Sequence, residues 1–350
     1  MTGGLLVIAH EATRTGSPAV LLRLLTAARD DLPHPISVRL LADGPLADDL
    51  RAVATTPSDG TGRPDVVLVN SALAAGELWR LPNDVPAAVY VHEQAIALGE
   101  LSDDALRALR ERAAVVLSVS EATTADLLEL GVAADRIRLL PPAVHRPDPT
   151  DAGTAAVRRE LSVRDDQRLV LGCGVAAWRK GADLFVPTCA RLAGRRELVF
   201  AWVGQRHRTE RRRLDHDTRA AGLDERVRWI GEVDDTSNWL AAADVLLMCS
   251  REDPQPLVPF EAAYCGTPTA GFDVGGLVSM GRTGAAVTVP FPDVAGLATA
   301  AESLIDDTAL ARATVDAATA LADRHHDLTI VAAEFAAVLN GLAADGRTTE

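Results

Sequence analysis

One stretch, Val245–Gly276, constrains the fold of this chain most, because its composition changes sharply at each predicted element boundary. Five apolar residues in a row, Val245–Cys249, are typical of a strand buried on both faces of a parallel sheet. A polar loop with prolines, Ser250–Pro256, follows, and a helix is expected to begin near Leu257 or Val258. A glycine, a proline and a second short apolar run come after it. The stretch therefore predicts strand, acidic loop, helix and strand.

Two carboxylates, those of Asp253 and Glu261, lie on either side of the predicted helix start. The start of a helix offers free backbone N–H groups and the positive end of the helix dipole, which suit a phosphate. Three prolines here lack that N–H, so the candidate phosphate donors narrow to Gln255, Leu257 and Val258. Carboxylates beside a phosphate suit sugar hydroxyls. Together these groups fit a nucleotide sugar, although the spacing alone also fits ordinary surface acids.

The residues around the two acids carry a family resemblance. The segment runs Asp253, seven residues, Glu261, Ala262, Ala263, Gly266 and Pro268, and Asp273, Gly275 and Gly276 close it. It resembles the signature of glycosyltransferase family 4, whose members are retaining enzymes of the GT-B fold. The resemblance implies that Asp253 holds the donor sugar and that Glu261 binds the ribose hydroxyls. The family pattern usually starts with glutamate, and Glu252 stands one place early, so the choice between Glu252 and Asp253 stays open.

Length and charge limit the class of protein. At 350 residues, two domains are expected rather than one core. The net charge of −14 argues against nucleic acid as a partner and against stable docking on an anionic membrane. The four cysteines are far apart and form no C-x-x-C pair, so reduced core thiols are expected. With no signal-like start and no uninterrupted apolar stretch of about 20 residues, we expect a cytoplasmic protein without membrane insertion.

The chain divides into two α/β domains at a polar linker, Arg146–Thr154. Apolar runs predict strands in the first domain at Leu5–Ala9, Ser37–Ala42, Asp65–Asn70, Ala87–His92 and Val115–Val119. The resemblance implies a GT-B architecture, in which two Rossmann-like, doubly wound parallel-sheet domains face each other across a cleft. The predicted boundaries are 1–146 for the acceptor-side domain and 155–326 for the nucleotide-sugar domain. A C-terminal helix at about 327–345 is expected to pack back on the first domain.

Two positions in the first domain are candidate donor contacts. Gly16 ends the polar loop after the first strand and resembles the family's glycine loop near the donor diphosphate; a tight turn is the alternative. His92 falls just beyond a predicted strand, where ligands bind in open α/β sheets. A lone histidine is more often structural, but His92 resembles the histidine that family members use to hold the donor sugar. The acceptor is expected near His10–Gly16 and His92–Ala97.

The second domain offers two adjacent cations, Arg179 and Lys180, on the loop after its first strand. Cations there would stabilise charge on a leaving phosphate, whereas the alternative is a pair of solvated surface residues. Lys180 and the glycine after it resemble the family's Gly…Lys-Gly motif. Gly174 stands where the family often has arginine, so Arg179 is expected to take that role. Gly231 resembles the loop that receives the nucleotide base.

A competing motif overlaps this loop. Gly172–Ala177 fits the G-x-G-x-x-A fingerprint of dinucleotide-binding domains. That fingerprint requires a helix at once and an acid at the end of the next strand. Here a loop intervenes and the next strand ends in Gly204 and Gln205, so a nicotinamide site is not expected.

The resemblance implies transfer of a sugar from a nucleotide-diphosphate donor to an acceptor hydroxyl, with retention and without a metal or other cofactor. The expected catalytic residues are Asp253, His92, Lys180 and Arg179. The acceptor, whether a glycan, a small molecule or a lipid-linked sugar, cannot be read from the sequence. Neither can the donor nucleotide.

Three other functions stay open at this point. A sugar-nucleotide epimerase or a glycoside phosphorylase could use the same fold, although the scarcity of lysine argues against a pyridoxal phosphate enzyme. A hydrolase with paired carboxylates fits less well, because these acids adjoin a predicted phosphate site. A non-catalytic sugar-nucleotide sensor or scaffold is the third, since the family's arginine and its glutamate after Gly276 are both missing.

Overall fold

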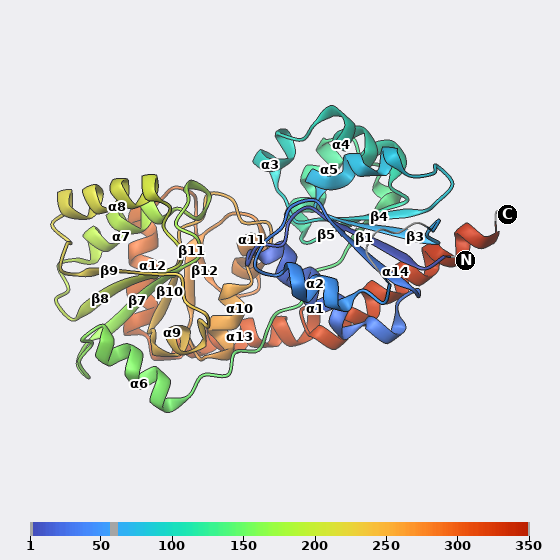
Figure 1. Cartoon of the computed structure of the whole chain (residues 1–350). Helices are drawn as coiled ribbons and strands as arrows, with labels where there is room; N and C mark the ends of the chain where they lie inside the picture. Colours follow the sequence, from blue (N-terminus) through green and yellow to red (C-terminus); the bar gives the residue numbers. More distant parts are fainter. Residues whose placement is uncertain (1–2, 57–61, 349–350) are drawn as a thin grey trace. The chain divides into compact units, whose positions relative to one another are not determined.

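The computed structural model describes residues 3–56 and 62–348 and divides the chain into two compact units (Figure 1). Unit 1 comprises Met1–Val144 and His325–Glu350, and unit 2 comprises His145–Arg324. The segment predicted as a linker, 146–154, therefore belongs to unit 2, and its last residues begin helix α6 (Asp151–Glu160). The helix began earlier than predicted because Thr150 caps it, its side chain accepting a hydrogen bond from Gly153 N at 3.1 Å.

Unit 1 is built on a parallel sheet of six strands in the order β2-β1-β3-β4-β5-β6. The strands are β1 (Leu5–Ala9), β2 (Ile36–Leu40), β3 (Val66–Asn70), β4 (Ala87–Val91), β5 (Val115–Ser118) and β6 (Ile137–Leu139). Every residue of β1, β3 and β4 is buried, which is why these strands are continuous apolar runs. The edge strand β6 was not predicted, because its three residues are partly exposed and carry no apolar pattern.

Helices cover both faces of this sheet. They are α1 (Gly16–Ala27), η1 (Arg29–Asp31), α2 (Ala47–Val53), η2 (Ala72–Arg80), α3 (Ala95–Gly99), α4 (Asp103–Arg107), η3 (Ala108–Arg112), α5 (Glu121–Glu129), η4 (Ala134–Arg136) and α14 (Leu328–Thr348). Ser102 and Ser120 cap α4 and α5, since Ser102 Oγ accepts from Ala105 N at 3.2 Å and Ser120 Oγ accepts from Thr123 N at 3.1 Å. Helix α1 begins at Gly16.

Near the C-terminus, α13 (Thr308–His325) of unit 2 is followed by α14 of unit 1. The stretch Thr308–Gly346 contains an 18-residue window of mean hydropathy 1.5, so by length and composition alone it could cross a membrane. In unit 1, α14 packs against α1 and β3, and Asp327 Oδ1 caps its start by accepting from Thr329 N at 2.9 Å. Core helices of globular domains have this same composition.

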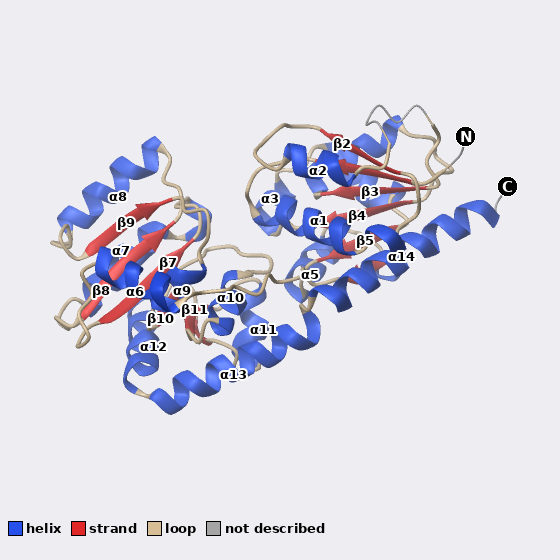
Figure 2. Cartoon of the chain, turned by 60° about the horizontal axis from the view of Figure 1, so that its bottom comes forward, coloured by secondary structure: helices blue, strands red, loops and turns tan. Residues whose placement is uncertain are grey.

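Unit 2 also contains a parallel sheet of six strands, in the order β12-β11-β10-β7-β8-β9, and the arrows of β7, β8 and β9 point the same way in Figure 2. The strands are β7 (Arg168–Cys173), β8 (Leu198–Val203), β9 (Val227–Gly231), β10 (Val245–Met248), β11 (Thr269–Phe272) and β12 (Val287–Val289). The other helices are η5 (Trp178–Lys180), α7 (Ala182–Leu192), α8 (Arg208–Ala220), α9 (Ser237–Ala242), α10 (Val258–Tyr264), α11 (Gly276–Arg282) and α12 (Val294–Asp306). Separate apolar clusters pack on each face of the sheet.

The strand order identifies one edge of each sheet as the place for a ligand. In unit 1 the chain reverses direction across the sheet between β1 and β3, and in unit 2 between β7 and β10. Loops at the carboxyl ends of strands on either side of such a reversal leave a crevice in open α/β sheets. In unit 2 these loops are 174–181 and 249–257, which contain the predicted cations and Asp253.

Candidate functional site

Asp253 lies at the centre of a charged cluster in unit 2. The residue is 4% exposed, and its Oδ2 accepts hydrogen bonds from Lys180 Nζ at 2.6 Å and from Ser250 Oγ at 3.2 Å. Its Oδ1 lies 3.6 Å from Arg179 Nη1, which also donates to the carbonyl of Glu252 at 3.0 Å. Two cations and a carboxylate that the sequence singled out on separate grounds thus meet within unit 2.

Lys180 is the single lysine of a sequence rich in arginine. It ends η5, and Gly181 follows in the left-handed conformation with φ of 67°. A Cβ on Gly181 would lie 1.9 Å from the carbonyl oxygen of Cys249. Only glycine therefore lets the two loops approach so closely, and this approach places the ammonium beside Asp253.

Arg251 was not predicted from the sequence as a site residue, although it holds together the two loops that carry Lys180 and Asp253. Its guanidinium donates to both carboxylate oxygens of Asp183, at 2.8 and 2.7 Å, and to the carbonyl of Trp178 at 2.7 Å. It also lies over the Trp178 ring, 5.0 Å from the centroid, and its backbone N donates to Arg179 O at 2.8 Å. A bidentate arginine–carboxylate pair is rigid. The only signal in the sequence was a charge next to the signature, which does not predict a partner 68 residues away.

Glu261 lies in the first turn of α10, which begins at Val258 as expected. Burial, followed by the nearby charge of Glu261, raises the pKa of the Cys173 thiol to about 12, and Lys180 opposes that rise. Cys173 ends β7. The effects of both charges on one thiol place Glu261 and Lys180 near the carboxyl end of the same strand.

The backbone donors predicted at the start of α10 are in place, within a helix of seven residues. In the part of the chain that the structure describes, the backbone N–H groups of Gln255, Leu257 and Val258 donate no hydrogen bond. The Gln255 side chain packs against Gly276, whose backbone N donates to Asp253 O at 3.1 Å. This contact fixes the loop that carries Asp253.

Two further predicted glycines, Gly174 and Gly231, have φ of 127° and 95°, in the region that favours glycine. Gly174 lies beside the Lys180 stem, since a Cβ on it would meet that side chain at 3.6 Å. Nothing lies within 4 Å of a Cβ built on Gly231, which ends β9. Both positions lie at the same sheet edge as Lys180.

His92 follows β4 in unit 1, as predicted, and it is a neutral hydrogen-bonding group. Its Nε2 lies 3.0 Å from Asn70 Oδ1, and its ring packs on Tyr90 with centroids 4.2 Å apart. Asn70 Nδ2 donates to Ser17 Oγ at 2.8 Å, which leaves Oδ1 to accept from the imidazole. Burial lowers the pKa of His92 to about 3. The imidazole is therefore uncharged at neutral pH.

Glu93 is the residue in unit 1 that sequence reasoning undervalued. Its carboxylate accepts from Ser71 Oγ at 2.5 Å, Ala72 N at 3.1 Å and His92 N at 3.0 Å. Burial raises the pKa of Glu93, and these three hydrogen bonds oppose the rise. Ser71 has φ of 96°, unusual for a non-glycine residue, and Glu93 holds it there. The acid thus fixes the backbone of His92.

Gly16, the other candidate in unit 1, is the first residue of α1, after the N-cap Thr15. A Cβ built on it would meet nothing within 4 Å, and its φ is not in the left-handed region. The fold of unit 1 therefore does not require glycine at this position. Any need for Gly16 would have to come from a ligand.

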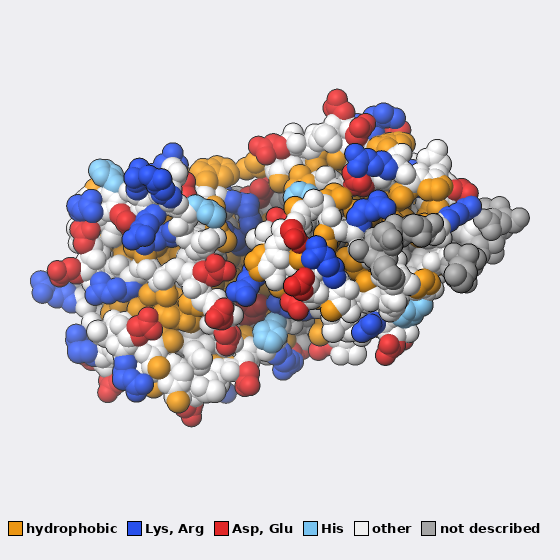
Figure 3. Space-filling model, viewed as in Figure 1, with side chains coloured by type: hydrophobic (Ala, Val, Ile, Leu, Met, Phe, Trp, Pro, Cys, Tyr) orange, Lys and Arg blue, Asp and Glu red, His pale blue; other side chains and the backbone are white. Residues whose placement is uncertain are grey.

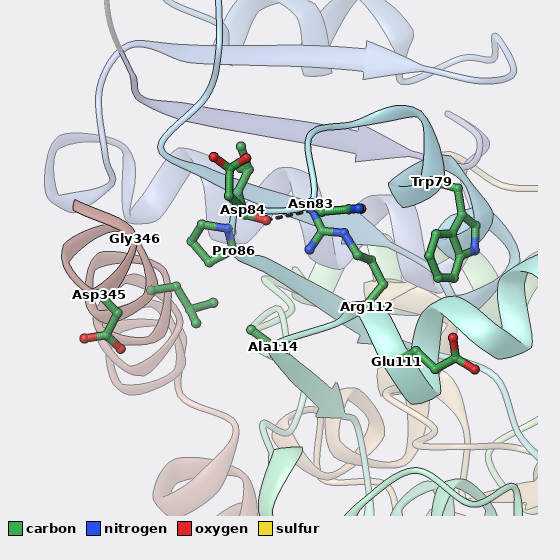
Figure 4. A pocket seen from close by; sticks show the side chains of 11 residues that line it. Trp79, Asn83, Asp84, Pro86, Glu111, Arg112, Ala114, Asp345 and Gly346 are labelled. Atoms are coloured by element: carbon green, nitrogen blue, oxygen red, sulfur yellow. Dashed lines mark hydrogen bonds between the residues drawn. The ribbon is translucent and has the colours of Figure 1, made fainter. Parts of the chain in front are cut away.

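Two cavities stand out, and none of the predicted site residues lines either. One, of about 600 Å³, lies in unit 1 by the amino ends of β4 and β5, with Trp79 and Glu111 on one side and Asp345 and Gly346 of α14 on the other (Figure 4). The second, of about 480 Å³, lies in unit 2. Among the described residues, no group of three or more His, Cys, Asp or Glu side chains is placed to hold a metal.

Comparison with known proteins establishes the family. A model for glycosyltransferase family 4 matches residues 10–146, and a model for glycosyl transferases group 1 matches residues 167–307. The 2-deoxystreptamine N-acetyl-D-glucosaminyltransferase of Streptomyces fradiae is 32% identical over 295 residues, which cover 76% of this chain and 68% of that protein. The chain belongs to the group 1, family 4 glycosyltransferases. The family resemblance in its sequence is confirmed, as is the expectation of a glycosyltransferase.

Other members of the glycosyltransferase family are matched over less of their length. The D-inositol 3-phosphate glycosyltransferase of Xylanimonas cellulosilytica is 30% identical over 221 residues, which cover 58% of this chain and 52% of that protein. This chain thus spans about half to two thirds of these two curated relatives.

Solved structures confirm the fold class of this glycosyltransferase. Anabaena HepE, crystallised with UDP, superimposes with a TM-score of 0.82 over 97% of this chain and 100% of that chain, at 18% identity. The lipopolysaccharide glycosyltransferase WaaG gives a TM-score of 0.74 over 96% and 100%, at 15% identity. The α/β, GT-B class expected from the sequence is correct.

Proposed function

We propose that this glycosyltransferase moves a sugar from a nucleotide-diphosphate donor to an acceptor hydroxyl, with retention of configuration and without a metal. The observation that carries the proposal is the cluster of Lys180, Arg179 and the buried Asp253 at the carboxyl edge of the unit 2 sheet. Structures similar to this chain include HepE with UDP and HepE with UDP-glucose, which favours such a donor.

The cations of the cluster suit a leaving diphosphate. As the bond from the sugar C1 to the diphosphate oxygen breaks, negative charge grows on the phosphate. Lys180 and Arg179 would stabilise that charge as a metal ion does elsewhere. The acceptor oxygen forms the new bond to C1 on the same face, and its proton passes to the departing phosphate oxygen. No separate side-chain base is then needed.

Asp253 has two roles in this proposal. Its carboxylate pairs with Lys180 at 2.6 Å, so the ammonium is held in position. When the diphosphate takes over the ammonium, Asp253 becomes available to sugar hydroxyls and to the positive charge that develops at C1. Glu261, near the end of β7, would bind the ribose hydroxyls, and the N–H groups of Gln255, Leu257 and Val258 would face the phosphates. Gly174 and Gly231 would let the nucleotide approach the backbone.

Unit 1 would supply hydrogen bonds rather than charge. The neutral His92, fixed by Asn70 and by Glu93, would contact a sugar hydroxyl, and Gly16 would leave room for the donor. The Streptomyces and Xylanimonas relatives are named for 2-deoxystreptamine and D-inositol 3-phosphate, both cyclic polyols. Among a glycan, a small molecule and a lipid-linked sugar, these names favour a small polyol as acceptor. Such soluble substrates agree with the proposed cytoplasmic location.

The test is nucleotide release from the purified chain with UDP-, GDP- and ADP-sugars, with and without cyclic polyols. We expect one donor to be consumed faster with an acceptor, in the presence of EDTA, and NMR to show the donor's anomeric configuration in the product. An inverted product would contradict retention, and loss of activity in EDTA would contradict metal independence. Binding without release would indicate a sensor or scaffold. Sugar conversion without nucleotide release would indicate an epimerase.

A further inference from the structure

The 480 Å³ cavity of unit 2 lies at the sheet edge opposite to Lys180 and Asp253. It is lined by the residues at the amino ends of β7, β8 and β9 and by the end of α6. Because the sheet is parallel, all amino ends meet at this edge and all carboxyl ends at the other. The cavity is therefore separate from the proposed donor site.

The lining of this cavity is strongly basic, in a protein whose net charge is −14. Four arginines line it, Arg164, Arg196, Arg226 and Arg228, against one carboxylate, that of the exposed Glu225. Such a concentration of one charge in a concave surface attracts the opposite charge. The overall composition, with a net charge of −14, does not predict a group of positive charges in this cavity.

Arg226 is built into the cavity wall. Its guanidinium donates to the carbonyls of Ala193, Arg195 and Leu198 at 2.5, 2.7 and 2.9 Å, and it lies 5.2 Å from the centre of the Phe200 ring. These partners are neutral, so the positive charge of Arg226 is not cancelled by an acid. Arg164, in contrast, pairs with Asp166 at 2.9 Å.

The other two arginines have side chains without partners in the described part of the chain. Neither Arg196 nor Arg228 makes a side-chain hydrogen bond or an ion pair there. Arg228 lies on the edge strand β9 and is partly buried. Ser162, also in the lining, has φ of 55° because it ends α6 in a left-handed cap, in which its backbone N donates to Arg159 O at 3.0 Å and Val163 N donates to Arg158 O at 2.8 Å. Its hydroxyl has no hydrogen-bond partner in the described part either.

The basic helix α8 provides a contrast. Its arginines contribute to the blue surface over α8 in Figure 3, and two of them pair with acids of the same helix, Arg213 with Glu210 at 3.1 Å and Arg211 with Asp215 at 3.8 Å. On that helix face, neighbouring acids neutralise these two arginines. In the cavity, Arg196 and Arg228 have no such acid partner in the described part of the chain.

We propose that this cavity binds the phosphate group of a small phosphate ester, at a site distinct from the donor site. Two free guanidinium groups can each form paired hydrogen bonds with phosphate oxygens. Arg226 adds an uncancelled positive charge, and the Ser162 hydroxyl adds a donor. The volume is within the range of small-ligand pockets. A free metabolite and a lipid headgroup would both supply this phosphate group with the same contacts.

The test is calorimetry of the full chain with glucose 6-phosphate. It is done in the Lys180→Ala background, so that the proposed diphosphate site does not contribute. We expect binding that the double substitution Arg196→Gln, Arg228→Gln weakens at least tenfold. The control is Arg212→Gln, Arg324→Gln, which removes two exposed arginines that have no hydrogen bond or ion pair in the described part of the chain. Thermal unfolding of both variants checks that the fold is intact.

A second arm identifies the source of the phosphate. Vesicles of phosphatidylcholine with phosphatidic acid are floated with each variant. Binding of vesicles but not of glucose 6-phosphate, again lost with Arg196 and Arg228, would assign a headgroup. Equal losses in the two double variants would show a general charge effect and overturn the proposal. Absence of binding to both probes would overturn it as well.

Discussion

Each unit has a parallel sheet whose strand order reverses once, and the loops at the carboxyl edge beside that reversal differ in chemistry between the two units. In unit 2 the loops carry fixed opposite charges, Lys180 against Asp253 at 2.6 Å and Arg251 against Asp183 at 2.7 Å. In unit 1 the edge carries His92, which is neutral at pH 7, and Glu93. The carboxylate of Glu93 accepts three hydrogen bonds, all from uncharged hydroxyl or backbone N–H donors. Because a fold does not prescribe chemistry, we propose charge recognition in unit 2 and hydroxyl recognition in unit 1.

The largest expected difference between the two edges is the loss of stability when a glycine is replaced by alanine. Gly181→Ala places a Cβ 1.9 Å from Cys249 O at a φ of 67°, so we expect unit 2 to lose about 3 kcal/mol or more of stability. Gly16→Ala in unit 1 meets nothing within 4 Å and should leave stability almost unchanged. Urea denaturation of both variants measures this. Equal stabilities would contradict the close approach that places Lys180.

The next effect concerns the charge of unit 2. Lys180→Ala should lower kcat by about 100-fold at saturating donor, because a preorganised group that stabilises the leaving diphosphate is lost. Lys180→Arg should restore only part of the rate, since a planar guanidinium cannot take the place of an ammonium held 2.6 Å from Asp253. Steady-state kinetics with the donor found above measures both. Normal turnover of Lys180→Ala would contradict the proposal that this loop stabilises the leaving diphosphate.

A smaller effect is expected from the neutral group of unit 1. His92→Ala should leave the affinity for the free nucleoside diphosphate nearly intact and lower transfer by about tenfold, as for a hydrogen bond realised in the transition state. Calorimetry with the nucleotide and turnover with the full donor separate the two quantities. A parallel fall of both would make His92 a structural residue.

The smallest effect concerns pH. Burial lowers the pKa of His92 to about 3, whereas an exposed imidazole titrates near pH ~6.5. The folded chain therefore binds fewer protons than the unfolded chain between these values. The stability from neutral His92 is complete above pH ~6.5 and is lost as pH falls toward about 3.

His92→Asn removes this contribution, so the variant should lose less stability than the parent chain between pH 7 and pH 5. Urea denaturation at the two pH values measures the difference. The control is His216→Asn, a change at an exposed histidine of α8. This variant should lose as much stability between pH 7 and pH 5 as the parent chain does. An unchanged pH dependence in His92→Asn would show that the imidazole is not buried in solution.

Buried strands could be predicted from the sequence, whereas exposed edge strands and contacts between distant residues could not. Strands such as β1 and β10 were located to within a residue, because burial on both faces leaves an unbroken apolar run. The edge strands β6 and β12, three residues each and partly exposed, leave no such pattern. Asp253 and Lys180 were singled out by local motifs. Their ion pair joins residues 73 apart, which no local pattern encodes.

The hydrogen-bonded network of unit 1 was harder to foresee. Glu93 was included only within the stretch His92–Ala97 expected near the acceptor, and its partner Ser71 lies 22 residues earlier, at the end of a different strand. The φ of 96° at Ser71 belongs to a serine, so no glycine marked the turn. The network arises from tertiary contacts between strand ends, and only the folded sheet brings them together.

The central claim is that the loops of unit 2 hold the donor diphosphate through Lys180, and the composition of the chain offers a direct test. Lys180 is the single lysine, and its side chain is 18% exposed, so an amine-reactive reagent followed by mass spectrometry reports on it alone among the side chains. UDP, GDP and ADP are each added at increasing concentration. We predict that at least one nucleoside diphosphate protects Lys180 in a saturable way. Modification at the same rate with all three nucleotides, in a chain that still transfers sugar, would contradict the claim.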